Sequence, residues 1–79
     1  MTNKEKYINA FKESLEIEES ALEGLEYQAV TEWDSVGHMG LIAELEDAFD
    51  IMMETDDIID FNSFEKGKEI LTNNYNIEF

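Results

Sequence analysis

The sequence predicts an all-α fold, a small antiparallel four-helix bundle with three longer helices and one short helix. Three stretches carry apolar residues at the spacing of helical turns, and no stretch alternates apolar and polar residues as a half-buried strand does. The chain has 79 residues, 43% of them hydrophobic, with neither Cys nor Pro. A chain of this length is expected to form one domain, residues 1–79, around a single core that no disulfide supports.

The first helix is expected to start at Thr2, whose hydroxyl can cap it while Glu5 reaches back in a capping box. Its apolar side is then made of Tyr7, Ile8, Phe11 and Leu15. Residues 16–34 lose the helical period and are expected to form a long loop, a feature that is uncommon and often functional. Scattered apolar side chains are expected to pin this loop to the core, namely Ile17, Leu22, Leu25, Tyr27 and Val30.

The second helix is the clearest element and is expected to run from Ser35 to about Asp50. At about 100° per residue, its core side is predicted to consist of Leu41, Ile42, Leu45, Ala48 and Phe49. Three glycines, Gly37, Gly40 and Gly67, each lower helix propensity by roughly 1 kcal/mol relative to Ala. Packing is therefore expected to compensate for them.

A short third helix is expected after Thr55, which is a good N-cap residue. Its packing side chains are expected to be Ile58, Ile59 and Phe61. The last helix is expected to begin after Asn62, with Glu65 three residues further on. It is expected to pack through Phe64, Ile70, Leu71 and Tyr75.

The charge of the chain is strongly acidic, with 20 Asp and Glu against 5 Lys and Arg and a formal net charge of −15. The basic residues all lie outside residues 13–65, and 17 of the 20 acids lie inside that stretch. Such a charge opposes binding to nucleic-acid phosphates and to anionic lipid surfaces, and it favours basic protein partners. No apolar run approaches the roughly 20 residues of a membrane span, and residues 1–6 do not resemble a secretory signal. A monomeric cytoplasmic protein is expected.

Catalytic residues are scarce. Without Cys and with one His, nucleophilic catalysis would depend on Asp34, Ser35 and His38, and closeness in sequence is not the geometry of a triad. The chain is therefore predicted not to be an enzyme, and His38 is expected to be a surface or partly packed residue.

A metal site is not predicted either. Asp56, Asp60 and Asn62 are spaced like part of a calcium-binding loop. However, Phe61 stands where such a loop needs Gly, and Gly67 stands where it needs a bidentate Glu. No dedicated metal ligands are therefore assigned.

Ser35 is the residue with the most chemical interest, because it stands at the start of the strongest helix after a long loop. Either Ser35 or Asp34 can be the N-cap. A phosphate attached to an exposed serine there would lie against free backbone N–H groups at the positive end of the helix dipole.

The outward side of the same helix is predicted to be a docking face. It combines apolar Val36, Met39 and Ala43 with a fringe of carboxylates, Glu44, Glu46, Asp47 and Asp50. A narrow apolar strip in an acidic frame beside Ser35 suits a protein partner.

In these features the chain resembles the acyl carrier protein family. The resemblance rests on Asp34-Ser35-Val36 at the start of an amphipathic helix, on Leu41 to Asp50 completing it, and on the apolar and acidic segment from Thr55 to Phe64. Length, acidity and helix order agree with it. It implies an acyl-carrier-protein-like bundle in which Ser35 carries 4′-phosphopantetheine, Asp34 helps to position the transferase complex, and Val36 and Met39 make apolar contacts with partners.

The same resemblance implies a set of partners. A phosphopantetheinyl transferase would attach the arm from coenzyme A, a ligase would load acyl or aminoacyl cargo as a thioester, and acyltransferases or synthases with basic docking patches would use it. Residues 37–40 are Gly-His-Met-Gly where fatty-acid carriers often have acids, and the Gly-Gly-(His/Asp)-Ser pattern of peptidyl carriers is absent. A carrier of a specialised pathway is therefore favoured, such as a polyketide-like, modified-lipid, surface-polysaccharide or aminoacyl-transfer pathway. The alternative is an acidic helical interaction module, an inhibitor or nucleic-acid mimic, without a covalent cofactor.

Overall fold

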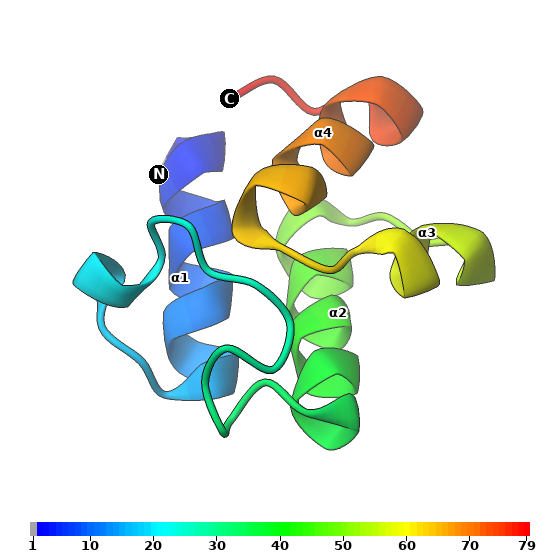
Figure 1. Ribbon diagram of the computed structural model, residues 1–79. Coiled ribbons are helices and arrows are strands. Elements are labelled where there is room, and N and C mark those ends of the chain that lie inside the picture. The colour runs from blue at the N-terminus through cyan, green and yellow to red at the C-terminus, as the bar shows by residue number, and fades with distance from the viewer. Residues whose placement is uncertain (1) are drawn as a thin grey trace.

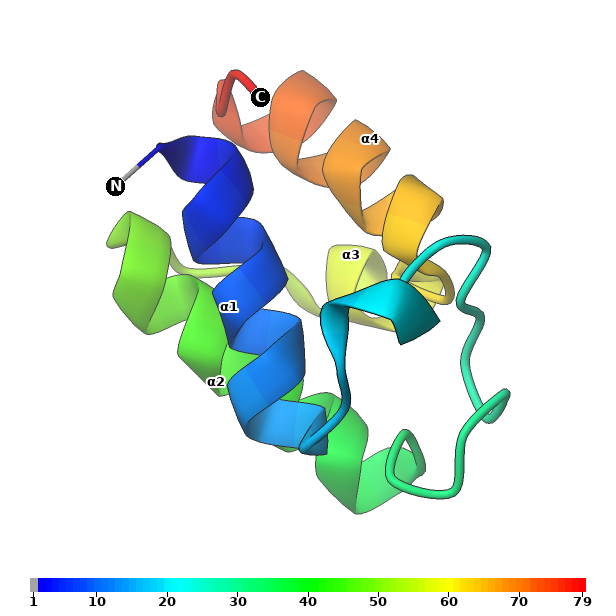
Figure 2. The same cartoon turned by 90° about the vertical axis from the view of Figure 1, so that its left-hand side faces the viewer.

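The computed structural model describes residues 2–79, which form four α-helices and one turn of 3-10 helix. In chain order these are α1 (Asn3–Leu15), η1 (Glu19–Ala21), α2 (Ser35–Phe49), α3 (Thr55–Asp60) and α4 (Phe64–Tyr75). Figures 1 and 2 show α1 and α2 side by side, with α4 beside the first turns of α1 and the short α3 between α2 and α4. Within residues 2–79 no strand forms, and the predicted all-α helical bundle of three longer helices and one short helix is confirmed. None of the described helices is long and apolar enough to cross a membrane.

The start of α1 matches its prediction. Thr2 Oγ1 accepts a hydrogen bond from the Glu5 backbone N–H (3.1 Å), and Glu5 Oε1 accepts one from the Thr2 N–H (3.3 Å). This capping box satisfies two N–H groups that the helix leaves unpaired. The hydrogen bonds from the Thr2 backbone and side chain lower the pKa of the Glu5 carboxyl.

The starts of the last two helices differ slightly from the prediction. Thr55 is the first residue of α3 and not its N-cap, a position that Glu54 occupies without a capping hydrogen bond from its side chain. In α4 the cap is Ser63 and not Asn62, because Ser63 Oγ accepts a hydrogen bond from the Lys66 N–H at 2.9 Å. Neighbouring polar residues can each serve as an N-cap, so the helix starts differ from the predicted ones by only one residue.

The core consists of apolar side chains from α1, α2, α4, the long loop and the segments that flank α3 and follow α4. Its buried members are Tyr7, Ala10, Phe11, Leu15, Leu22, Leu25, Trp33, Leu41, Ile42, Leu45, Met53, Phe61, Phe64, Ile70, Leu71 and Ile77. The prediction for α2 is confirmed at Leu41, Ile42 and Leu45, whereas Ala48 and Phe49 are half-buried. The prediction for Ile59 is wrong, because this side chain is 70% exposed. Adjacent residues of a helix point about 100° apart, and the six-residue α3 packs against the core through the half-buried Ile58 while Ile59 points away.

Apolar side chains of the long loop pack into the core, as predicted. Backbone hydrogen bonds also connect the loop to the segment between α3 and α4. Leu22 and Leu25 are buried. The Tyr27 N–H donates to the Asn62 carbonyl (2.8 Å), and the Phe64 N–H donates to the Leu25 carbonyl (2.9 Å). These two bonds hold the loop in place before the chain enters α2. They therefore position the loop next to the first turn of α2.

Glycines occupy two places where helices meet a neighbour very closely. A Cβ on Gly67 of α4 would collide with the Phe61 ring and the Tyr7 hydroxyl, and a Cβ on Gly37 of α2 would collide with the Glu32 carbonyl. Packing compensates for the low helix propensity at these two positions. At Gly40 no close neighbour requires a glycine, because a Cβ there would meet nothing within 4 Å.

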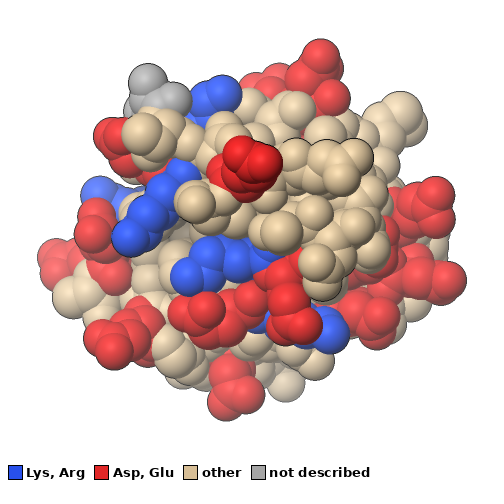
Figure 3. Space-filling model, turned by 90° about the horizontal axis from the view of Figure 1, so that it is seen from above, with Lys and Arg blue, Asp and Glu red and all other residues tan. Residues whose placement is uncertain are grey.

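The charges are unevenly distributed over the fold. All the lysines lie on α1 and α4, while the loop, α2 and α3 carry acids without any Lys or Arg. Figure 3 shows lysines on the face seen from above, with carboxylates around them. Among the described residues one salt bridge forms, Lys68 Nζ to Glu65 at 3.2 Å. Most carboxylates therefore repel one another without a compensating partner.

We expect the melting temperature to rise with salt. The molecule measures 29 × 27 × 20 Å, which is comparable to the Debye length at low ionic strength, roughly 30 Å at 0.01 M. Sodium chloride at about 0.5 M screens the repulsion and is expected to raise the melting temperature by roughly 5 °C or more. Circular dichroism at several salt concentrations measures this shift. A melting temperature that does not change with salt would show that repulsion among the carboxylates is unimportant.

The buried hydroxyl of Tyr7 gives a prediction for alkaline pH. It donates a hydrogen bond to the Phe64 carbonyl at 2.6 Å, and burial raises its pKa far above the ordinary value of 10.0. Because the folded state favours the protonated phenol, this contribution to stability is complete below pH 10 and is lost as the pH rises beyond it. Tyr7→Phe removes this buried hydrogen bond, while the Phe64 carbonyl keeps the bond from the Lys68 N–H within α4, and the loss is expected to cost about 0.5–1.5 kcal/mol at neutral pH. Urea unfolding at pH 7 and pH 11 tests both statements, and a cost below about 0.5 kcal/mol at pH 7 would contradict the first.

Candidate functional site at the head of α2

Asp34 is the N-cap of α2. Its backbone is extended, and its Oδ1 accepts a hydrogen bond from the Gly37 N–H at 2.8 Å. Its carbonyl accepts a second bond from the His38 N–H at 2.8 Å. The choice between Asp34 and Ser35 as the capping residue, which the sequence left open, is therefore decided in favour of Asp34.

Ser35 is consequently the first helical residue, and it is exposed. No group within residues 2–79 hydrogen bonds to its hydroxyl. The backbone N–H groups of Ser35 and Val36 also have no acceptor among the described residues, since the first turn of a helix has no preceding carbonyls. A free hydroxyl thus lies beside two free N–H groups at the positive end of a 15-residue helix.

Gly37 lets the loop pass directly over the first turn of α2. The Glu32 carbonyl occupies the place where a Cβ would stand, and Leu15 Cδ2 lies 3.3 Å from that position. The loop can therefore reach Asp34 from the core side of the helix. This close approach is what leaves Ser35 on the outside.

His38 connects the loop to α3. The Trp33 indole Nε1–H donates to His38 Nδ1 at 3.0 Å, and His38 Nε2 lies 2.7 Å from the Ile58 carbonyl oxygen. The Trp33 and His38 rings are stacked at an angle of 20°, and the Tyr27 ring meets the imidazole edge-on at 5.6 Å. His38 is partly packed, as predicted.

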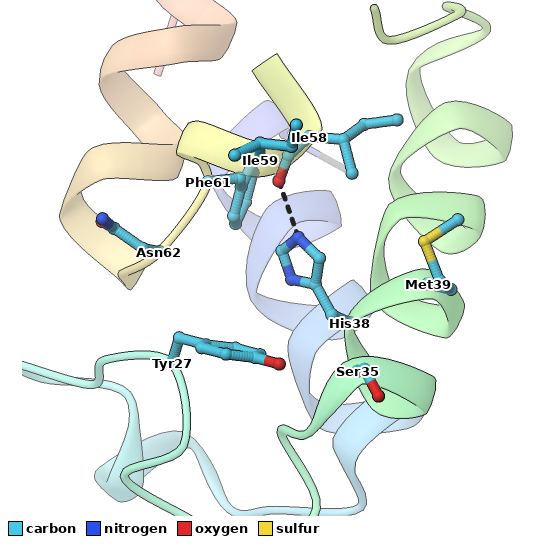
Figure 4. A pocket seen from close by; sticks show the side chains of 8 residues that line it. All are labelled: Tyr27, Ser35, His38, Met39, Ile58, Ile59, Phe61 and Asn62. Atoms are coloured by element: carbon cyan, nitrogen blue, oxygen red, sulfur yellow. Dashed lines mark hydrogen bonds between the residues drawn. The ribbon is translucent and has the colours of Figure 1, made fainter. Parts of the chain in front are cut away.

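A pocket of about 360 Å³ opens beside Ser35. Figure 4 shows it between the loop, the head of α2 and α3, with the imidazole of His38 in its middle. Its lining is mostly apolar and comprises Tyr27, Ser35, His38, Met39, Ile58, Ile59, Phe61 and Asn62. The loop supplies one wall and α3 the other, and the walls are linked by the contacts of His38 and by the hydrogen bond from the Tyr27 N–H to the Asn62 carbonyl.

The predicted docking residues fall into three groups. Val36 (80% exposed) and Met39 (57% exposed) face solvent, together with Ala43, Asp47 and Asp50. These five residues form the outward face of α2.

The other two predicted docking acids lie at the sides of this face. Glu44 lines a second pocket of about 270 Å³ between α2 and α1, together with Lys6 and Glu13. Glu46 is half-buried, and its Oε2 accepts a hydrogen bond from the Met53 N–H at 2.9 Å. Glu46 therefore stabilises the turn after α2, a role that the sequence analysis did not predict.

Six of the eight pocket residues are not among the site residues expected from the sequence. Tyr27, Ile58, Ile59 and Phe61 are expected there only to pack, His38 to be a surface or partly packed residue, and Asn62 to precede the last helix. The sequence does contain an indication of the pocket. The single Trp and the single His of the chain, Trp33 and His38, lie on either side of Ser35. Both side chains could be expected to turn toward the core side of the same helix start.

The geometry thus brings Ser35, Asp34 and Met39 together at one end of α2, beside the pocket. Comparisons of the chain with models of protein families, with curated proteins and with solved structures found no match. The function is therefore inferred from the residues and their geometry.

Proposed function

We propose that this protein is a carrier of the acyl carrier protein type, with the antiparallel helix arrangement of that family. In this proposal Ser35 bears a 4′-phosphopantetheine arm, and the chain presents acyl or aminoacyl cargo to the enzymes of a specialised biosynthetic pathway. The protein is then a substrate of other enzymes and has no catalytic residues of its own.

The observation that supports this proposal best is the free hydroxyl of Ser35 at the first position of α2, with Asp34 acting as the cap. The other three serines differ from it. Ser14 donates to the Ala10 carbonyl at 2.6 Å, Ser63 caps α4, and Ser20 lies in the three-residue η1. Ser35 is the serine that combines an exposed hydroxyl with the start of a long helix.

The residues at this site fit a phosphodiester. A phosphate on Ser35 Oγ would lie near the free N–H groups of Ser35 and Val36, where the helix dipole favours an anion. Asp34 keeps its carboxylate on the Gly37 N–H, so the cap and the phosphate do not compete for the same donor. The apolar pocket beside Ser35 can cover part of an attached chain.

The attachment chemistry follows from the hydroxyl. Ser35 Oγ forms a bond to the phosphorus next to the pantetheine of coenzyme A, the pyrophosphate P–O bond breaks, and adenosine 3′,5′-bisphosphate leaves. The serine proton passes to a base on the transferase. The arm supplies a terminal thiol that holds cargo as a thioester, and the chain has no Cys that would compete with it.

The partners in this proposal are a phosphopantetheinyl transferase, a loading ligase and acyltransferases or synthases, each with a basic patch. The outward face of α2 offers apolar Val36 and Met39 beside Asp47 and Asp50, with no Lys or Arg on α2 or α3. Complementary charges mainly raise association rates and select partners, which suits brief encounters.

The test is the intact mass of the protein after incubation with coenzyme A, magnesium and a broad-specificity transferase. Wild type and Ser20→Ala are expected to gain one phosphopantetheine, and Ser35→Ala is expected to gain none. Circular dichroism of Ser35→Ala should match wild type, because the hydroxyl has no hydrogen bond to lose within the described chain. Unmodified wild type beside a fully modified control carrier would contradict the proposal and favour an acidic interaction module.

The outward face of α2 gives a separate prediction about rate. Replacing Asp47 and Asp50 by Asn is expected to slow modification roughly three- to tenfold at low salt, because the basic transferase is attracted less strongly. Replacing Glu69 and Glu78 by Gln removes the same charge away from α2 and should have little effect. Initial rates at low and high salt measure the difference, and equal rates for both double variants would show that this face does not guide the transferase.

A further inference from the structure

His38 links the two walls of the pocket, in addition to the backbone hydrogen bond from Tyr27 to Asn62. One ring nitrogen contacts the loop through Trp33. The other contacts α3 through the Ile58 carbonyl, as Figure 4 shows. The proposed carrier chemistry does not use the imidazole. We call these three groups, the Trp33 indole, the His38 imidazole and the Ile58 carbonyl, the histidine latch.

The partners determine the protonation of the ring. An indole N–H can only donate a hydrogen bond, so Nδ1 must present a lone pair to Trp33. A carbonyl oxygen can only accept, so Nε2 must carry the proton toward Ile58. The latch is therefore formed by neutral His38 with the proton on Nε2.

Proton uptake affects the two bonds differently. The proton must go to Nδ1, where it would face the Trp33 N–H, and that hydrogen bond is lost. The bond from Nε2 to the Ile58 carbonyl remains, and a cation is favoured there because the last carbonyls of α3 lie at the negative end of the helix. Trp33 is fully buried, so its released N–H has to find a new acceptor by local opening of the loop.

The polar and titratable groups around His38 come from three elements. The loop brings Tyr27 against the ring, with centroids 5.6 Å apart. On α2 the nearby acid is Asp34, whose carboxylate is engaged in the cap. On α3 the ring meets the Ile58 carbonyl, and the Asp57 carboxylate is hydrogen-bonded to Asn74 and Tyr75 of α4.

We propose that the histidine latch is a proton-sensitive switch that controls the loop wall of the pocket beside Ser35. Neutral His38 fastens Trp33 and the loop to α3. Protonated His38 keeps its hydrogen bond to α3 and releases the Trp33 indole, which loosens the loop around Trp33, while the backbone bond from Tyr27 to Asn62 still ties the loop to the end of α3. The switch belongs to the unmodified protein, so it does not depend on whether Ser35 is modified.

The test follows the two side chains by NMR on the ¹⁵N-labelled, unmodified protein, where the single His and the single Trp give unambiguous signals. At about pH 8 the imidazole is expected in the Nε2–H form. As the pH falls to about 5.5, solvent exchange of the Trp33 indole N–H is expected to rise at least about tenfold, with the same midpoint as the His38 nitrogen shifts.

His38→Gln is the matched control, because a Gln side chain can accept from Trp33 and donate to Ile58 without titrating. Its indole exchange is expected to stay slow over the same pH range. Three results would overturn the proposal: an imidazole that stays neutral throughout, a protonated His38 with unchanged indole exchange, or the same rise in exchange in His38→Gln.

Discussion

Gly67→Ala is expected to destabilise the protein by roughly 3 kcal/mol, although it adds a single methyl group to a helix. The new Cβ would overlap the Phe61 ring and the Tyr7 hydroxyl, which are both fixed in the core. Neither ring can move easily, because Tyr7 is bonded to the Phe64 carbonyl and Phe61 lies among other aromatic rings. A domain of this size has roughly 4–12 kcal/mol of stability in total, so the loss is a large part of it.

Urea unfolding of Gly67→Ala measures this cost, and a second substitution identifies its cause. Phe61→Leu removes the ring atoms that collide with the new Cβ, so the double variant is expected to lose less stability than the sum of the two single variants. A cost below about 1 kcal/mol for Gly67→Ala would mean that α4 is not packed as closely as described.

Gly37→Ala is expected to be the second most damaging substitution, with a cost of about 2 kcal/mol or more. The Cβ would overlap the Glu32 carbonyl, which is backbone and cannot rotate away. The displaced carbonyl precedes Trp33, so the hydrogen bond from Trp33 to His38 is expected to weaken as well.

Gly40→Ala is the matched control for Gly37→Ala, because it places the same methyl group three residues later in α2 with no atom within 4 Å. It is expected to stabilise the protein by up to about 1 kcal/mol through helix propensity. Equal effects of the two substitutions would show that the loop does not cross the first turn of α2 as closely as described.

The helices and most of the core could be predicted from the sequence, because their periodicity and caps are local properties. Thr2 and Glu5 carry the signal of the first helix start, and Leu41, Ile42 and Leu45 carry that of the core side of α2. Ile59 could not be assigned, since a six-residue helix has no measurable period.

The candidate site was only partly predictable. Ser35 and the outward face of α2 follow from one helix and its angles. The roles of Glu46 and Trp33 depend on partners several residues away in the sequence that the fold brings into contact, namely the Met53 N–H and the His38 imidazole. Periodicity shows which way a side chain points, but it does not show which donor or acceptor the fold brings to it.

The most direct measurement of the carrier role is the mass of the protein purified from the cells that make it, followed by fragmentation of its peptides. The account predicts a species heavier by one phosphopantetheine, with the added group on the peptide that contains Ser35. A protein that remains unmodified in those cells, while another carrier in the same extract is modified, would contradict it.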